Sequence, residues 1–271
     1  MFDKLIENAA RLSMDNKNEG DYFDGENLLI CGKCRKRKQM IIEFPKGRKR
    51  VVGITCDCDK EEERLIEQSR KTERTRNYII SLYKKGLTDK AYLNNTFEKD
   101  NGNNPELTRL CKKYADNWEK VEKNPFGLLL YGDVGGGKSF FACCIANALI
   151  NRGVPVLVTR LSDLVKNRVD NEKETVNLHS FKLIVLDDIG VENNSQTAFN
   201  IVDEIYRANI PLIVTTNLTP SQIKNPENIE KKRIYDRIIE RCCVTKLVPV
   251  NKSRIAKAKQ HKSEALKLIG G

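Results

Sequence analysis

The chain has 271 residues, with 48 lysines and arginines against 37 aspartates and glutamates, and a formal net charge of +11. This charge favours a polyanionic partner, nucleic acid first, although a merely basic soluble protein is the alternative. No segment has the roughly 18 apolar residues that cross a bilayer, and the N-terminus lacks the apolar segment of a signal peptide. Composition therefore argues against an integral membrane protein and predicts a cytoplasmic one.

Two cysteine pairs near the N-terminus frame a segment whose pattern predicts a β-hairpin: KQMIIEF, PKGRKR and VVGIT. Thiolates facing one another across such a hairpin can supply a closed, tetrahedral zinc site. Four unpaired thiols in a reducing compartment are the alternative. We therefore expect a small zinc-binding domain over residues 1–75, with Cys31, Cys34, Cys56 and Cys58 as ligands.

Residues 59–100 mix both charge signs over a sparse apolar stripe, which predicts an exposed connecting helix. We assign residues 76–104 as a linker between two domains. From residue 105 an apolar stripe at helical spacing is followed by alternating strand-like and helical stretches. The strand-like runs are FGLLLYG (126–132), VPVLVTR (154–160), KLIVLDD (182–188) and IPLIVTTN (210–217). Unbroken apolar runs separated by helices predict an α/β three-layer sandwich with a mostly parallel sheet over residues 105–271.

The first of these runs leads into a segment that matches the phosphate-binding pattern G-x-x-x-x-G-K-[ST] in full. Its glycines let backbone N–H groups turn toward phosphate oxygens at the positive end of the following helix. Lys138 is expected at the β- and γ-phosphates and Ser139 at Mg²⁺. The residues expected to contact ATP here are Gly132, Asp133, Val134, Gly135, Gly136, Gly137, Lys138, Ser139 and Phe140.

Two further runs end in polar residues. Asp187 and Asp188 follow the apolar run LIVL, and a carboxylate at the end of a buried strand is costly without a nearby cation. We expect Asp187 to anchor Mg²⁺ through water and Asp188 to orient the attacking water as the base. Asn217, at the end of the last run, is expected to hydrogen-bond that water or the γ-phosphate.

Arg233, Arg237 and Arg241 lie four residues apart, on one drifting face of a predicted helix. Such a row is usually a solvated face, but in an ATPase one arginine can reach the γ-phosphate bound by a neighbouring subunit. Arg254 is a candidate for nucleotide contact within its own chain.

Taken together, these motifs resemble the DnaC/DnaI-type loaders of the replicative DNA helicase, AAA+ ATPases, and particularly their phage-like members. The resemblance spans residues 28 to 250. It rests on the segments GDVGGGKS (132–139), LIVLDDIG (183–190), VTTNL (214–218), RIYDRIIERC (233–242), NTFEKDN (95–101) and the N-terminal cysteine segment.

This resemblance implies that the zinc domain grips the hexameric helicase, while the AAA+ domain binds single-stranded DNA and self-associates. It implies an arginine finger at Arg237, a first sensor at Asn217 and a second sensor at Arg254. Position 188 is Asp where AAA+ proteins commonly carry Glu, which favours slow, switch-like hydrolysis but could be neutral.

Three other readings remain open. An IstB-like helper ATPase of DNA transposition shares the same motifs. A small-molecule P-loop kinase would need no arginine in trans. A zinc-dependent DNA-binding module could carry a vestigial ATPase. The DNA prediction itself rests on the net charge and on Arg160, Lys166 and Arg168 near the second strand.

Overall fold

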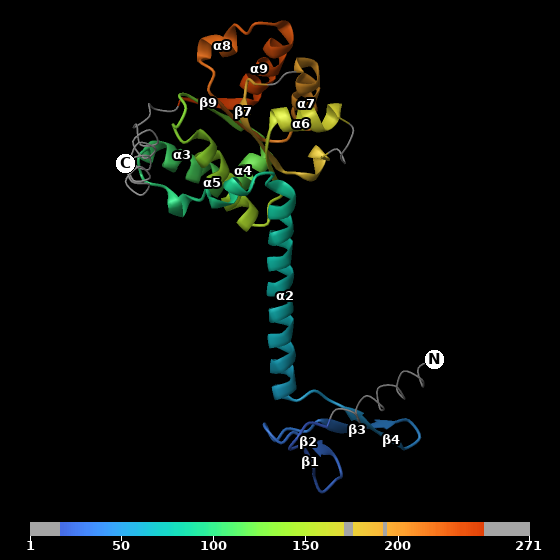
Figure 1. The fold of residues 1–271 in the computed structure, drawn as a ribbon. Helices are drawn as coiled ribbons and strands as arrows, with labels where there is room; N and C mark the ends of the chain where they lie inside the picture. Colours follow the sequence, from blue (N-terminus) through green and yellow to red (C-terminus); the bar gives the residue numbers. More distant parts are fainter. Residues whose placement is uncertain (1–16, 171–175, 192–193, 247–271) are drawn as a thin grey trace, which may run out of the picture. The chain divides into compact units, whose positions relative to one another are not determined.

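The computed structural model describes residues 17–170, 176–191 and 194–246, and the chain divides into two compact units, residues 1–75 and 76–271 (Figure 1). We call them the first and the second unit. The long helix α2 (Asp57–Gly86) begins in the first unit and ends in the second. Among the described residues, no helix combines the length and apolarity that a membrane span needs.

The first unit contains two small antiparallel pairs of strands. β1 (Tyr22–Phe23) pairs with β2 (Leu29–Ile30), and β3 (Gln39–Phe44) pairs with β4 (Arg48–Gly53). The second pair is the hairpin that the sequence predicts. Lys46 and Gly47 both adopt positive φ at its tip, which closes the turn tightly.

The second unit is built on a five-stranded sheet in the order β6-β7-β8-β5-β9, and every neighbouring pair is parallel. Four strands coincide with the predicted apolar runs. They are β5 (Gly127–Tyr131), β6 (Val156–Arg160), β7 (Leu183–Ile189) and β8 (Leu212–Thr216). The predicted mostly parallel sheet is therefore confirmed.

The fifth strand, β9 (Cys242–Lys246), was not predicted. It lies beside β5 and pairs with it from Gly127↔Cys242 onward. This approach is close: a Cβ on Gly127 would lie 1.8 Å from the carbonyl oxygen of Leu212 and 2.8 Å from Cys242 Sγ. Gly127 thus lets three strands meet where β5 begins.

Helices cover both faces of this sheet, because successive residues of each strand point to opposite sides. Leu128 and Leu130 of β5 pack with α3, α4 and α5, whereas Leu129 packs with α6, α7 and α9. The bounds are α3 (Pro105–Asp116), α4 (Trp118–Lys123), α5 (Lys138–Asn151), α6 (Leu161–Val169), α7 (Ser195–Arg207), α8 (Pro220–Lys224) and α9 (Ile229–Arg241). The three-layer sandwich is confirmed (Figure 1).

The segment predicted as a linker is packed into the second unit. Leu82 of α2 and Tyr92 of the short helix η1 (Lys90–Asn94) are buried in its core. Between them, the backbone N–H and the hydroxyl of Thr88 both donate to the carbonyl of Val158 in β6. Two further short helices, η2 (Phe97–Lys99) and η3 (Leu178–Ser180), complete the described elements.

Candidate functional site

The phosphate-loop pattern forms the turn between β5 and α5. Gly132, Gly135 and Gly137 adopt φ values of 145°, 86° and 86°. These are conformations that residues with a Cβ rarely take, so the loop depends on glycine at these positions. Gly137 directly precedes α5, and the loop therefore sits at the positive end of a 14-residue helix.

Lys138 is buried, and three oxygens hold its ammonium group. Its Nζ lies 2.9 Å from the carbonyl oxygen of Gly132, 2.8 Å from that of Asp133 and 2.8 Å from Asn217 Oδ1. Burial lowers the pKa of Lys138, and the charges of nearby aspartates oppose that shift. The ammonium is thus fixed inside the loop by weak carbonyl and amide partners that phosphate oxygens can replace.

Asn217 connects the loop to the acidic pair. Its Oδ1 accepts from Lys138, and its Nδ2 donates to Asp188 Oδ1 at 2.8 Å. Asp188 has a φ of 58°, at an irregularity in the pairing of β7 with β8. The structure therefore brings three predicted residues, from α5, β7 and the end of β8, into one hydrogen-bonded chain.

Asp187 is buried beside this chain, and both of its carboxylate oxygens accept hydrogen bonds. Thr215 Oγ1 donates to Oδ1 at 2.7 Å, and the hydroxyl of Tyr92 donates to Oδ2 at 3.2 Å. Burial raises the pKa of Tyr92, so the ring stays a neutral donor. Thr215 also accepts from the backbone N–H of Asp188 at 2.8 Å, which couples the two aspartates.

Sequence reasoning missed Thr215, Tyr92 and Asn147. The pair of threonines at the end of an apolar strand could have pointed to Thr215, because it lies beside the strand that ends in the acids. Tyr92 lies 95 residues before Asp187 in the chain, and its local sequence carries no signal. It is placed by Asn147 of α5, whose Nδ2 donates to the carbonyls of Tyr92 and Asn95.

This arrangement fits a nucleoside triphosphate with Mg²⁺. The loop offers backbone and ammonium donors to phosphates, and Asp187 offers carboxylate oxygens, the ligands that Mg²⁺ prefers. Ser139 is half-buried at the start of α5, next in sequence to Lys138. The residues that would hold the ion are therefore Ser139 and Asp187, as the sequence predicts.

The arginine row packs on its own chain. Arg237 lies in α9, with Nε 3.3 Å from Asp203 Oδ1 of α7 and its guanidinium over the ring of Tyr206, 4.4 Å from the centroid. Arg241 also lies over Tyr206, and Arg233 lies over Phe199. All three arginines therefore contribute to the packing of α9 on α7.

Two other predictions concern charged residues. Arg254 lies outside the described residues. Of the cations suggested for DNA, Arg160 ends β6, and Lys166 is exposed on α6. Arg168 also lies on α6 but is paired with Glu204 of α7. Salt-bridge formation leaves Arg168 less available for phosphate than Lys166.

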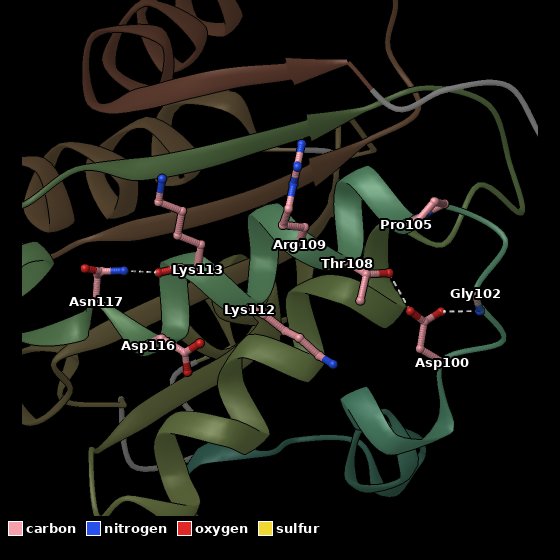
Figure 2. A pocket seen from close by; sticks show the side chains of 9 residues that line it. All are labelled: Asp100, Gly102, Pro105, Thr108, Arg109, Lys112, Lys113, Asp116 and Asn117. Carbon is pink, nitrogen blue, oxygen red and sulfur yellow. Dashed lines mark hydrogen bonds between the residues drawn. The ribbon is translucent and has the colours of Figure 1, made fainter.

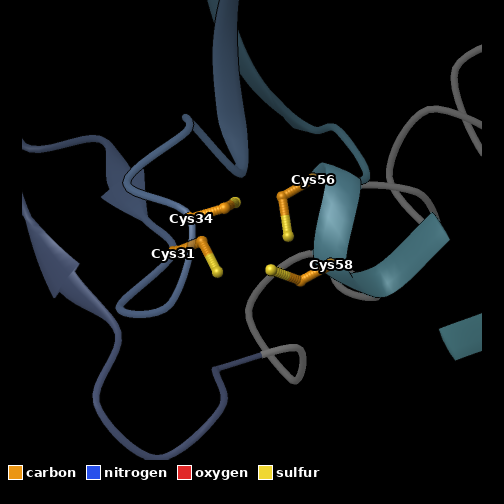
Figure 3. A group of neighbouring side chains, drawn as sticks. All are labelled: Cys31, Cys34, Cys56 and Cys58. Atoms are coloured by element: carbon orange, nitrogen blue, oxygen red, sulfur yellow. The ribbon is translucent and has the colours of Figure 1, made fainter. Parts of the chain in front are cut away.

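The four predicted zinc ligands lie together in the first unit. Cys31 and Cys34 come from the turn after β2, and Cys56 and Cys58 from the start of α2. Figure 3 shows their sulfur atoms pointing into a common centre, and all of them lie within 4.8 Å of one another. Tetrahedral zinc with Zn–S bonds of about 2.3 Å places its sulfurs about 3.8 Å apart, which is compatible with this spacing.

The surroundings of the cluster also suit a cation. The backbone N–H of Lys36 stabilises the Cys34 thiolate and lowers its pKa to about 6. Burial raises the pKa of Cys56 to about 12. One thiolate is therefore already favoured, and a metal ion would supply the charge that the more buried thiol needs in order to lose its proton.

A separate open groove of about 570 Å³ lies along α3 (Figure 2). It contains none of the residues that the sequence predicts for ATP. Figure 2 shows Lys112 pointing away from Arg109 and Lys113, so its cations do not converge on one position. A small-molecule site needs convergent polar groups, and this groove lacks them. Its lining is Asp100, Gly102, Pro105, Thr108, Arg109, Lys112, Lys113, Asp116 and Asn117.

The chain is similar in sequence to several known proteins. One relative, a putative insertion sequence ATP-binding protein of Sinorhizobium fredii, is 34% identical over 100 residues, which cover 35% of this chain and 33% of the relative. Another, the replicative helicase loader DnaC of Buchnera aphidicola subsp. Schizaphis graminum, is 26% identical over 160 residues, covering 54% and 64%. The chain thus matches only part of the length of these curated relatives.

Among solved structures, a putative primosome component from Streptococcus pyogenes is similar, with a TM-score of 0.51 and 20% identity. The match covers 61% of this chain and 93% of that one, and it concerns the fold alone. The sequence pattern of the family described as IstB-like ATP binding protein matches residues 61–265. This match covers well over half of the 271 residues of the chain. The chain therefore belongs to the family of IstB-like ATP-binding proteins.

Proposed function

We propose that this protein is an ATP-dependent loader of the replicative DNA helicase, which binds ATP with Mg²⁺ and single-stranded DNA during the initiation of replication. The observation that carries the proposal is the chain from Lys138 through Asn217 to Asp188. It joins the phosphate loop to the acid that orients water, as an ATP-driven switch requires. The similarity to DnaC supports the choice of partner.

In the proposed reaction, phosphate oxygens of ATP replace the carbonyl oxygens of Gly132 and Asp133 as partners of Lys138. Ser139 and Asp187 would hold Mg²⁺, which would supply positive charge against the β- and γ-phosphates. Asp188 then accepts a hydrogen bond from the attacking water. Because Asn217 hydrogen-bonds both Lys138 and Asp188, loss of the γ-phosphate would change the partners of Asn217. Hydrolysis would in this way alter the contacts at the end of β8.

The proposed domains divide the work. Residues 1–75 form the zinc-binding domain that contacts the helicase, and residues 105–271 bind and hydrolyse ATP. Residues 76–104 join the two and also pack into the core of the ATPase domain through Leu82 and Tyr92. The basic residues Arg160 and Lys166 are proposed to contact single-stranded DNA. The short side chain of Asp188, where a longer Glu is common, supports slow hydrolysis.

Self-association is proposed through the ATPase domain, with Arg237 reaching the nucleotide of a neighbour. For this, Arg237 must leave Asp203 and Tyr206. Mixing Arg237→Ala subunits with Lys138→Ala subunits tests the idea. ATPase activity regained on mixing supports a shared site, and two variants that stay inactive together contradict it.

A second function has its own support. The family to which the chain belongs and its similarity to an insertion sequence ATP-binding protein favour a helper of DNA transposition. Purified full-length protein with ATP should bind purified hexameric replicative helicase from the same organism if it is a loader. Binding to the transposase of a neighbouring mobile element, with no binding to the helicase, would replace the loader by the transposition helper.

A further inference from the structure

The positive charge of the chain is concentrated in one short part of the first unit. Residues 33–50 contain nine lysines and arginines and a single glutamate. Four of these cations are paired with carboxylates: Lys36, Arg37, Lys38 and Lys49. The other five have no carboxylate partner among the described residues, and they are Lys33, Arg35, Lys46, Arg48 and Arg50.

Three of the unpaired cations lie at the tip of the β3–β4 hairpin. Lys46 is in the turn, and Arg48 and Arg50 are in β4. Arg48 and Arg50 are two residues apart, so they share one face and lie about 6.8 Å apart along the strand. The hairpin therefore presents three cations on a compact, tightly turned ribbon.

The same face carries apolar side chains. Phe44 lies opposite Arg48, and Ile42 lies opposite Arg50. No other described strand pairs with this two-stranded hairpin, and Ile42 is 37% exposed. A face that alternates guanidinium groups with apolar side chains can bind phosphates and pack against sugars and bases at the same time.

We propose that the tip of this hairpin, which we name the basic ribbon and define by Lys46, Arg48 and Arg50, binds the phosphate backbone of nucleic acid. Two features favour nucleic acid over an acidic protein. Interfaces with nucleic acid are much more positively charged than those between proteins, where lysine is depleted. A two-stranded ribbon also has the dimensions that the major groove of DNA admits.

This site differs from the DNA contacts proposed for the ATPase domain at Arg160 and Lys166. It requires neither ATP nor a helicase, so it is independent of the proposed function. The cluster of Cys31, Cys34, Cys56 and Cys58 would hold the ribbon in shape from its base. The cations themselves are not needed for that fold, because the structure gives them no carboxylate partner there.

The test uses the full-length protein without nucleotide and measures fluorescence anisotropy of labelled single-stranded and duplex oligonucleotides over a range of salt concentrations. The variant Lys46→Ala/Arg48→Ala/Arg50→Ala should bind about tenfold more weakly or worse at low salt. The slope of log K against log salt should fall by about 2 for single strands, because each lost phosphate contact removes about 0.7.

A matched control removes the same charge from exposed lysines of the second unit, as Lys120→Ala/Lys123→Ala/Lys224→Ala. It should keep the affinity and slope of the wild type. Equal losses of affinity in both variants would show that binding depends only on net charge, and would overturn the proposal. Unchanged binding by the ribbon variant would also overturn it. A ribbon variant that binds DNA normally but no longer binds a helicase would assign the cations to a protein partner instead.

A variant expected to bind more tightly distinguishes a lost contact from a folding defect in the triple variant. Glu43 pairs with Lys49 across the hairpin. Glu43→Gln removes the one acid of the segment and frees Lys49, so the affinity for the oligonucleotides should rise several-fold. Unchanged zinc content and circular dichroism would show that every variant is folded. A Glu43→Gln protein that binds no more tightly than the wild type would contradict the proposal.

Discussion

The two units of this protein differ in the interactions that stabilise their interiors. The second unit buries a five-stranded sheet between two helical layers, and residues such as Leu130, Ile145 and Val185 are 0% exposed. The first unit has a two-stranded hairpin whose Met40 and Ile41 are 43% and 41% exposed. Besides the buried Leu28, Leu29 and Ile30, it contains a cluster of four thiols and a buried ion pair. A small unit cannot bury enough apolar surface, so specific bonds must replace area.

The largest effect should come from disrupting the cysteine cluster that we propose binds zinc in the first unit. Cys31→Ser or a chelator should unfold this unit, because zinc contributes on the order of 10 kcal/mol to small zinc domains. Limited proteolysis should then cut within residues 17–75 and leave the second unit intact. The control is Cys243→Ser, which changes an exposed thiol of the second unit. Equal resistance of the Cys31→Ser protein and the wild type would show that the first unit is stable without metal.

In the second unit, the strongest functional effect should come from Lys138→Ala. Loss of the only ammonium in the phosphate loop should reduce ATP hydrolysis by on the order of a hundredfold or more. The unit should stay folded, since its core lies elsewhere. Steady-state hydrolysis and thermal unfolding measure the two effects, with Lys224→Ala as a control for surface charge. A folded Lys138→Ala protein that hydrolyses ATP at the normal rate would contradict the assigned site.

The buried charge of the first unit offers a sharper contrast. Lys38 Nζ lies 3.0 Å from Asp21 Oδ2 and 3.1 Å from Asp59 Oδ2, with side chains that are 4%, 2% and 18% exposed. Lys38→Met would leave the acids without this partner and should cost about 3–5 kcal/mol of unfolding free energy. Lys85→Met, on the exposed surface of α2, should change stability little. Equal unfolding midpoints would contradict this role of Lys38.

The same ion pair predicts acid sensitivity. Burial raises the pKa of Asp21, but hydrogen bonds from the N–H groups of Gly32 and Asn18 and from Lys38 outweigh it and lower the pKa below 3.8. A lowered pKa in the folded state stabilises the fold above the unfolded value and loses that contribution as pH falls through the folded one. The first unit should therefore lose stability below about pH 4, as followed by proteolysis. Lys38→Met should weaken this pH dependence.

The smallest effect is expected at Tyr92. Tyr92→Phe removes one hydrogen bond to the Asp187 carboxylate, worth about 1.5–3 kcal/mol. The ring stays in the core, so folding should persist while the orientation of Asp187 loosens. We expect a several-fold shift in the Mg²⁺ concentration that gives half-maximal ATP hydrolysis. The control Tyr83→Phe removes a hydroxyl bonded to Asn151 instead. Identical Mg²⁺ dependence in Tyr92→Phe and the wild type would show that Tyr92 serves packing alone.

Much of the architecture could be predicted from local pattern. The four apolar runs became β5, β6, β7 and β8, because a strand buried on both faces must be continuously apolar. The N-terminal hairpin was also predicted. β9 was not predicted, because the segment Cys242–Lys246 is short and mixed in polarity. It forms a strand only through its pairing with β5. Cys243 of β9 is exposed, since β9 lies at the edge of the described sheet.

The candidate site divides in the same way. Glycines, a lysine and acids at the ends of strands are recognisable because their chemistry depends on spacing along the chain. The linker prediction shows the opposite case. Residues 76–104 look polar in sequence, yet Leu82 and Tyr92 complete the core of the second unit. Scattered apolar residues do not reveal which distant surface will cover them.

The sequence by itself determined the phosphate loop, the acidic pair and the spacing of the four cysteines, because each is a local arrangement set by covalent order. Only the tertiary structure decided that Asn217 joins Lys138 to Asp188, that Tyr92 donates to Asp187 and that Arg237 lies against α7. These contacts join residues from 29 to 95 positions apart. They depend on strand order and register, which the packing of the whole sheet selects rather than any single segment.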